Sequence, residues 1–281
     1  MRWLLFLLFC ATAAPGQEVV RAYGAIALAL PLSEAVPTLR TERNIELVLY
    51  SGGGTDVGLT ALGNRATQIA LCSRALTPTD RAEFPGIQFN EIPVGTQMLV
   101  LAVSRDVFVG GVRILSAEQM RGIYEGRITN WQQVGGPDLR IRLLMHEQGR
   151  GVWELFAQWL YGEIKKAPLW TGETMRNFQE ARNLLEFTAG GCAVLPPALI
   201  DSRYHFALSI SGSKGQVIQP TVANAVEGKY PLSRPLVMVT AGRPAGGARV
   251  VVDFMTGEKG QELIKRHGYV GLEEMKAAKG K

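Results

Sequence analysis

The sequence is poor in the residues that metal sites, redox sites and catalytic nucleophiles require. It has three cysteines and three histidines in 281 residues, and no C-x-x-C pair. Because the histidines also lie far apart along the chain, we expect no zinc site, no redox motif and no other cofactor. The sequence lacks G-x-x-x-x-G-K-[ST], G-x-S-x-G and H-E-x-x-H, so nucleotide hydrolysis, serine hydrolysis and zinc proteolysis are without their usual signatures.

Long runs of positive charge are absent as well. The formal net charge of +5 comes from 30 basic and 25 acidic residues that are dispersed along the chain. No Lys/Arg run reaches the five to eight residues that are typical of a nucleic-acid patch, so we expect no nucleic-acid partner. The mild positive balance favours anionic small-molecule partners instead.

The first residues contain a short apolar run but nothing long enough to span a bilayer. Arg2 precedes this run, and Ala11-Thr-Ala13 places small residues where a signal peptidase reads them. We interpret residues 1–13 as a signal peptide that is removed on export to the periplasm. A membrane anchor, or a lipid on Cys10, is disfavoured because the run is far shorter than about 20 residues and a bulky Phe9 precedes the cysteine.

The mature chain reads as an α/β protein, and its length suggests two lobes. Short apolar runs alternate with helical patterns, which favours largely parallel sheets. The predicted strands are 45–50, 68–71, 98–103 and 235–240. The run at 98–103 is fully apolar and is predicted to be a buried parallel strand. The predicted helices are 56–62, one that begins with a Ser116–Gln119 capping box, one after Gly151, and most of 248–267.

Two glycine-rich turns, each leading into a helix, are the candidates for chemistry. Ser51-Gly-Gly-Gly-Thr55 follows a predicted strand, and Gly149-Arg-Gly151 precedes an amphipathic helix. Such turns present free backbone N–H groups to an anion. In the first turn, Thr55 has the residue type of a helix N-cap. In the second turn, Arg150 adds a guanidinium that could bind two oxygens of the anion. Ordinary turns with no ligand remain open alternatives for both.

A third polar stretch follows the strand at 68–71. Ser73 and Arg74 lie at the carboxyl end of this strand, where α/β proteins bind ligands. Cys72 precedes them, and the sequence leaves open whether it pairs with Cys192 or is a buried apolar residue.

Several longer motifs resemble one known family. Met120 to Asp138 contains Arg-Ile-Thr-Asn-Trp, Tyr230 to Leu236 reads Tyr-Pro-Leu-Ser-Arg-Pro-Leu, and a Lys259 to Tyr269 segment follows in the same order. With the two stretches that contain Thr55 and Ser73, these segments are similar to bacterial phosphate-binding proteins, the periplasmic substrate-binding subunits of phosphate ABC importers. The resemblance covers nearly the whole mature chain.

The resemblance implies a type II periplasmic binding fold, in which two α/β lobes enclose a ligand. It implies lobe limits of 18–98 with 232–281 for the first lobe and 99–231 for the second. It further implies a protein that is not an enzyme, that works as a monomer, and that delivers phosphate or a related oxyanion to an ABC permease in the inner membrane. We expect the ligand-binding residues of the cleft to be Gly54, Thr55, Ser73, Arg74, His146, Arg150 and Gly151.

The chain departs from the family at two of the four phosphate-binding loops. Gly24 to Leu28 has no hydroxyl, and His146 to Val152 reads His-Glu-Gln-Gly-Arg-Gly-Val where the family has Arg-x-x-Gly-Ser-Gly-Thr. The alternative function is therefore a divergent, non-transport member of the fold that acts in signalling or protein–protein contact.

Overall fold

The protein is built from two sheets, each covered by helices, as a computed structural model shows. The structure describes residues 16–146, 151–170, 172–212 and 214–280. The predicted signal peptide and Arg150 therefore lie outside the described residues. Within those ranges, no helix is both long and apolar enough to cross a membrane.

Lobe one, as we name the part built on the first sheet, has five strands in the order β2-β1-β3-β12-β4. The strands are β1 (Glu18–Gly24), β2 (Ile45–Ser51), β3 (Ile69–Cys72), β4 (Phe89–Met98) and β12 (Ser233–Ala241). Its helices are α1 (Ile26–Arg43), α2 (Gly54–Gly63), α3 (Pro78–Glu83), α9 (Gly246–Thr256) and α10 (Glu258–Arg266). A further helix, α11 (Leu272–Lys279), follows near the C-terminus.

Lobe two, the part built on the second sheet, has the strand order β11-β10-β5-β9-β7-β8, with β6 beside β10. The strands are β5 (Val100–Ser104), β6 (Ile114–Ser116), β7 (Arg142–His146), β8 (Thr174–Met175), β9 (Gly191–Leu195), β10 (His205–Ser211) and β11 (Val217–Ile218). The α-helices are α4 (Arg105–Val109), α5 (Ala117–Tyr124), α6 (Gly151–Tyr161), α7 (Phe178–Phe187) and α8 (Val222–Val226). Three short 3-10 helices are η1 (Trp131–Val134), η2 (Ile164–Lys166) and η3 (Pro197–Leu199).

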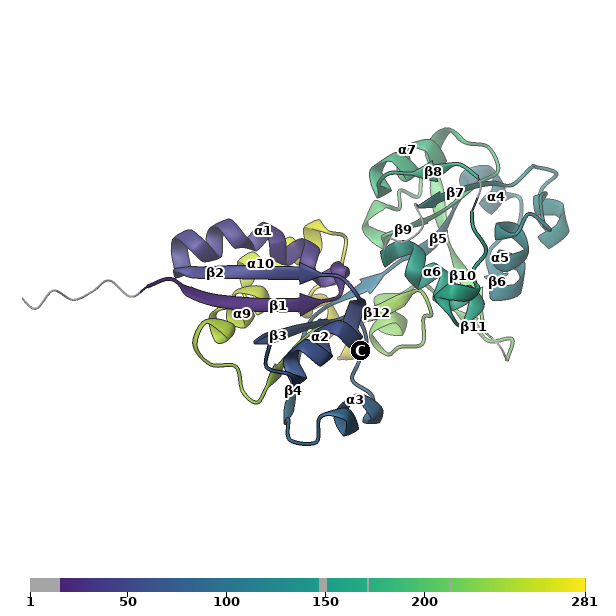
Figure 1. Ribbon diagram of the computed structural model, residues 1–281. Coiled ribbons are helices and arrows are strands. Elements are labelled where there is room, and N and C mark those ends of the chain that lie inside the picture. The colour runs from purple at the N-terminus through teal and green to yellow at the C-terminus, as the bar shows by residue number, and fades with distance from the viewer. Residues whose placement is uncertain (1–15, 147–150, 171, 213, 281) are drawn as a thin grey trace, which may run out of the picture.

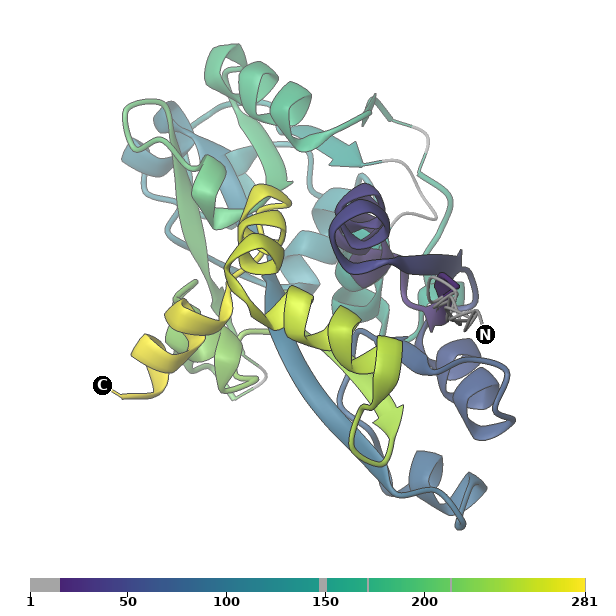
Figure 2. The ribbon, with the colours of Figure 1, turned by 90° about the vertical axis from the view of Figure 1, so that its left-hand side faces the viewer.

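The chain passes between the two sheets twice. It leaves the first sheet at Leu99, between β4 and β5, and it returns between α8 and β12. The two passages are joined where the Leu99 N–H donates to the Leu232 carbonyl at 2.9 Å. Figure 1 shows the two lobes side by side, and Figure 2 shows the blue β4–β5 segment running from one lobe to the other. The predicted two-lobe α/β fold is thus confirmed.

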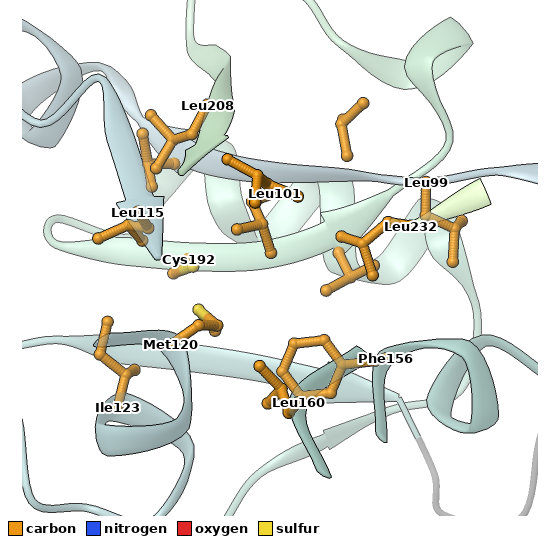
Figure 3. Close-up of a cluster of buried hydrophobic side chains, with 14 of the residues drawn as sticks. Leu99, Leu101, Leu115, Met120, Ile123, Phe156, Leu160, Cys192, Leu208 and Leu232 are labelled. Atoms are coloured by element: carbon orange, nitrogen blue, oxygen red, sulfur yellow. The ribbon is translucent and has the colours of Figure 1, made fainter. Parts of the chain in front are cut away.

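Each lobe has its own apolar core. In lobe two, Leu101, Leu115, Phe156 and Leu208 pack together from β5, β6, α6 and β10 (Figure 3). The corresponding core of lobe one is formed by side chains from α1, the central strands and the two helices α9 and α10. Each lobe therefore has the buried apolar layer that an independently packed unit needs.

The predicted direction of one strand is wrong. The apolar run at 98–103 was expected as a buried parallel strand, but β5 pairs antiparallel with both β9 and β10. All five residues of β5 are buried, and the first four are apolar. The apolar run therefore reflects burial of both faces of the strand, whatever the direction of its neighbours. Both sheets in fact mix parallel and antiparallel pairs, since β12 runs antiparallel to β3 and to β4.

The two cysteines of the described chain are not paired. Cys72 lies in β3 and Cys192 in β9, in different sheets, and both are free and buried. Burial raises the pKa of each thiol to about 12. They are therefore packing residues rather than reactive thiols.

Candidate functional site

A pocket of about 200 Å³, which we name the small pocket, lies where the two lobes face each other. Lobe one supplies the ends of β1, β2 and β3 with the residues that follow them, together with Arg234 of β12, and lobe two supplies Glu154 of α6. The lining residues are Gly24, Ala25, Ile26, Ala27, Ser51, Gly52, Gly53, Gly54, Ser73, Glu154 and Arg234. This position, at the carboxyl ends of parallel strands β1, β2 and β3, is where α/β sheets bind ligands.

Two helices of lobe one begin in the small pocket. The α1 helix starts at Ile26 and α2 starts at Gly54, and neither has a side-chain cap at its N-terminus. The first N–H groups of an α-helix have no partner within the helix, and the helix dipole places partial positive charge there. Two uncapped N-termini in one pocket therefore form an environment suited to an anion.

Glycine is required at the turn into α2. Gly53 and Gly54 both have positive φ, of 71° and 68°, a region that other residues avoid. At Gly53 a Cβ atom would also lie 2.1 Å from Val57 Cγ2. The predicted helix at 56–62 begins two residues earlier than expected, so Thr55 lies inside α2 and is not its N-cap.

Arg234 is the strongest positive charge in the small pocket, and the sequence reasoning missed it. Its side chain is only 15% exposed, its Nε donates to Gln97 Oε1 at 2.7 Å, and Nη1 lies 3.9 Å from Glu154 Oε2. Burial lowers the pKa of Arg234, although a guanidinium remains protonated at neutral pH. Arg234 belongs to the Tyr230–Leu236 motif, which we had used only to identify the family.

Thr55 and Ser73, two of the expected cleft residues, are in direct contact. The Ser73 N–H donates to Thr55 Oγ1 at 3.0 Å, which ties the first turn of α2 to the end of β3. Ser73 and Gly54 line the small pocket, whereas Thr55 is 7% exposed and lies behind them. Thr55 therefore supports the pocket wall, whereas Ser73 is, with Ser51, one of the two hydroxyl residues in the lining.

Arg74, although adjacent to Ser73, is not among the residues that line the small pocket. Its guanidinium binds Asp80 through Nη1 at 2.6 Å and Asp56 through Nη2 at 2.6 Å. The Arg74 guanidinium holds the pKa of Asp80 well below its usual range. Two carboxylates thus already balance the charge of Arg74, which leaves Arg234 as the pocket's guanidinium.

The predicted residues of the second turn are only partly described. Arg150 lies outside the described residues, and Gly151 is the first residue of α6. His146 ends β7, is 5% exposed, and places Nε2 3.1 Å from the Val194 carbonyl oxygen. Its ring packs edge-on against Phe178, with centroids 4.7 Å apart.

His146 lies in the wall of a second, larger cleft between the lobes. This pocket of about 720 Å³, which we name the large pocket, is adjacent to the small pocket and shares Ile26 and Ala27 with it. Helix α1 and the chain around Lys265–Tyr269 contribute to it from lobe one, and β7, α7 and η3 contribute from lobe two. The first glycine-rich turn, the start of α6 and His146 therefore all border the space between the lobes.

The chemistry of the small pocket is that of a binding site for a small anion. Its lining offers backbone N–H groups, the hydroxyls of Ser51 and Ser73, the Arg234 guanidinium and the Glu154 carboxylate. Among the described residues, no group of three or more His, Cys, Asp or Glu side chains is placed to hold a metal ion. Among the described residues that line the small pocket, none is a histidine that could activate Ser73 as a nucleophile.

Comparisons with known proteins agree with this geometry. The family model described as the PBP superfamily domain matches residues 11–259. The phosphate-binding protein PstS of Borreliella burgdorferi is 24% identical over 266 residues, covering 91% of each chain. PstS of Bacillus subtilis is 23% identical over 83% of this chain and 73% of its own.

Solved structures share the fold. The structure of a possible phosphate binding protein from Planctomyces limnophilus superimposes with a TM-score of 0.78 at 20% identity, over 94% of this chain and 97% of that one. An ABC-type phosphate transport receptor from Vibrio cholerae gives a TM-score of 0.69 at 21% identity, over 90% and 99%. The resemblance seen in the sequence is thereby confirmed, and the chain belongs to the PBP superfamily.

Proposed function

We propose that this protein is an exported solute-binding protein that holds phosphate, or a closely related oxyanion, in the small pocket between its lobes. The observation that carries the proposal is the buried Arg234 beside the uncapped starts of α1 and α2. Backbone N–H groups bind an anion without a full counter-charge, so the ligand can be released again. The curated relatives named phosphate-binding proteins support phosphate as the ligand.

The wider role follows from the same relatives. One structural neighbour is described as an ABC-type phosphate transport receptor, which supports delivery of the ligand to an ABC permease in the inner membrane. We propose a periplasmic monomer without enzymatic activity, with lobes at 18–98 plus 232–281 and at 99–231. The sheet membership of the strands supports these limits, because every strand before Leu99 and the strand after Leu232 belong to the first sheet.

Glu154 would let the small pocket discriminate between oxyanions that carry a proton and oxyanions that do not. A carboxylate accepts hydrogen bonds but donates none, so beside a bound anion it needs a partner that carries a proton. Hydrogen phosphate has such a proton at neutral pH, and sulfate does not. The pair formed by Arg234 and Glu154 therefore favours phosphate over sulfate.

Calorimetry with inorganic phosphate tests the proposal. We expect the wild type to bind and Arg234→Gln to weaken binding by about 1.5–3 kcal/mol, which is roughly 10- to 150-fold in Kd, the range for hydrogen bonds to charged groups. Arg234→Lys, which keeps the charge but not the forked geometry, should lose less. Arg249→Gln, an exposed guanidinium on α9, is the matched control and should bind as the wild type does.

The non-transport alternative has one observation in its favour. The first loop offers Ala25 and Ala27, both buried and without a hydroxyl, and Arg74 is engaged elsewhere. This reading predicts that the wild type binds neither phosphate nor sulfate, and that Arg234→Gln then changes nothing in the same titrations.

A further inference from the structure

The two pockets between the lobes are adjacent. Ile26 and Ala27, at the start of α1, line both of them. Gln97 lines the large pocket, and its Oε1 accepts the 2.7 Å hydrogen bond from Arg234 Nε of the small pocket. A ligand held by Arg234 in the small pocket would therefore have the large pocket directly beside it.

The wall of the large pocket is apolar next to this junction. Ile26 and Leu30 of α1 are 42% and 46% exposed, high values for large aliphatic side chains. They share the pocket with Phe178 and Leu199 of lobe two. Exposed apolar surface is unfavourable in water. An apolar ligand group that covers Leu30 would therefore make the free energy of binding more favourable.

Most of the charged groups near the rim of the large pocket already have a partner. Arg266 and His267 both contact Glu34, at 3.0 Å and 2.8 Å, and Arg176 lies 3.8 Å from Glu180. Lys265 is the remaining cation in the lining. This distribution favours an uncharged group against the wall rather than a second strongly charged one.

The volumes indicate a ligand larger than a free oxyanion. The small pocket of about 200 Å³ is on the scale of a single tetrahedral anion, whereas about 720 Å³ lies within the range of pockets that hold organic molecules. Resting on the proposed anion site, we propose that the cleft also binds phosphate monoesters, with the phosphoryl group in the small pocket and an uncharged apolar ester group against Ile26 and Leu30.

Glu154 and Arg234, 3.9 Å apart, are the charged groups that would face the phosphoryl group of such a ligand. The Glu154 carboxylate lines the small pocket and favours a phosphoryl group that carries a proton. The second pKa of a phosphate monoester is about 6, so the singly protonated form dominates at pH 5.5. The monoester is therefore expected to bind more tightly at pH 5.5 than at pH 7.5.

Calorimetry of the mature protein with phenyl phosphate tests this inference at pH 5.5. Inorganic phosphate, which represents the phosphoryl group, and phenol, which represents the ester group, are titrated separately for comparison. We expect phenyl phosphate to bind in competition with inorganic phosphate, and phenol alone to give no measurable heat. Leu30→Gln, a neutral change outside the small pocket, should weaken phenyl phosphate about fivefold and leave inorganic phosphate within about twofold. Leu169→Gln, an 85% exposed leucine of lobe two outside both pockets, is the control and should change neither.

The outcomes separate the two proposals. Binding of inorganic phosphate without binding of phenyl phosphate would overturn the monoester inference and leave the proposed function standing. Binding of neither would overturn both. An equal effect of Leu30→Gln on the two ligands, or no effect on either, would show that the ester group does not lie on the α1 wall and would also overturn the inference.

Discussion

At the scale of single residues, the small pocket depends on one charged pair that the sequence did not reveal. Arg234 and Glu154 are 80 positions apart and come from different lobes, so no local motif could show that they lie 3.9 Å from each other. By contrast, the Ser73–Thr55 contact was predictable, because both residues follow strands that are neighbours of β1 in the sheet.

Glu154→Gln tests the role of the carboxylate in choosing the anion. The amide of glutamine can donate a hydrogen bond as well as accept one. In Glu154→Gln it can therefore donate to an oxyanion that carries no proton, such as sulfate. We expect the ratio of phosphate to sulfate affinity at pH 7.5 to fall by about tenfold, on the order of one hydrogen bond to a charged group. Competition calorimetry with both anions measures this ratio. Glu258→Gln, in the first turn of α10, is the matched control, and a wild-type ratio in Glu154→Gln would show that Glu154 does not contact the ligand.

Asp80 links local stability to pH. Besides binding Arg74, it accepts from the Thr77 N–H at 2.6 Å and completes a capping box at the start of α3. Since the pKa of Asp80 is lowered in the folded state, its contribution is present above the unfolded pKa of about 3.9 and is lost as the pH falls further, through the folded pKa.

We therefore expect Asp80→Asn to lower the free energy of unfolding by about 1 kcal/mol at pH 7 and pH 5, and by less at pH 3. Urea denaturation at the three pH values measures the difference. Asp253→Asn removes an exposed ion pair on α9 and should change little. If the loss in free energy of unfolding caused by Asp80→Asn grew as the pH falls, the pKa of Asp80 would not be lowered in the folded state, and the prediction would be wrong.

At the scale of elements, most helices and strands could be predicted because their signals are local. The Ser116–Gln119 capping box does begin α5, and the helix ends at Tyr124 as expected. The helix expected at 248–267 is instead two helices, because Gly257 takes an extended conformation with ψ of 177° and separates α9 from α10. Strand direction was not predictable, as β5 shows, since it depends on which distant strands lie beside it.

The motif that identified the family most clearly has a structural role. In the Arg127–Asp138 segment, Asn130 caps η1, and the Trp131 ring is fully buried with Nε1 donating to the Gly190 carbonyl at 2.9 Å. None of these three residues lines the small pocket. The segment therefore indicates the fold of lobe two, whereas the ligand must be argued from Arg234 and the helix starts.

The position of α2 against β1 depends on Gly58. A Cβ atom at this position would lie 2.5 Å from the Tyr23 carbonyl oxygen, so Gly58→Ala must push the helix away from the strand. We expect a loss of about 1–3 kcal/mol in the free energy of unfolding, as for overpacked cores. Phosphate affinity should fall as well, because the start of α2 is part of the small pocket.

Urea denaturation and calorimetry of Gly58→Ala measure these two effects. Gly86→Ala is the matched control, since a Cβ atom there meets nothing within 4 Å. Wild-type stability and binding in Gly58→Ala would show that the close packing of α2 on β1 is not needed to form the pocket.

At the scale of the whole molecule, the small pocket exists only because two lobes face each other. Neither lobe alone supplies both Arg234 and Glu154, and the large pocket likewise has one wall from each lobe. Two-lobed binding proteins can close on a ligand by hinge motion, and the two passages of the chain near Leu99 and Leu232 are the places where such a motion would occur.

A crystal structure of the mature protein with inorganic phosphate tests the central claim most directly. We predict one tetrahedral anion in the small pocket, within hydrogen-bond distance of the Arg234 guanidinium and of backbone N–H groups at the starts of α1 and α2, with one oxygen facing Glu154. An anion bound only elsewhere on the protein, or a small pocket that contains only water at saturating phosphate, would contradict it.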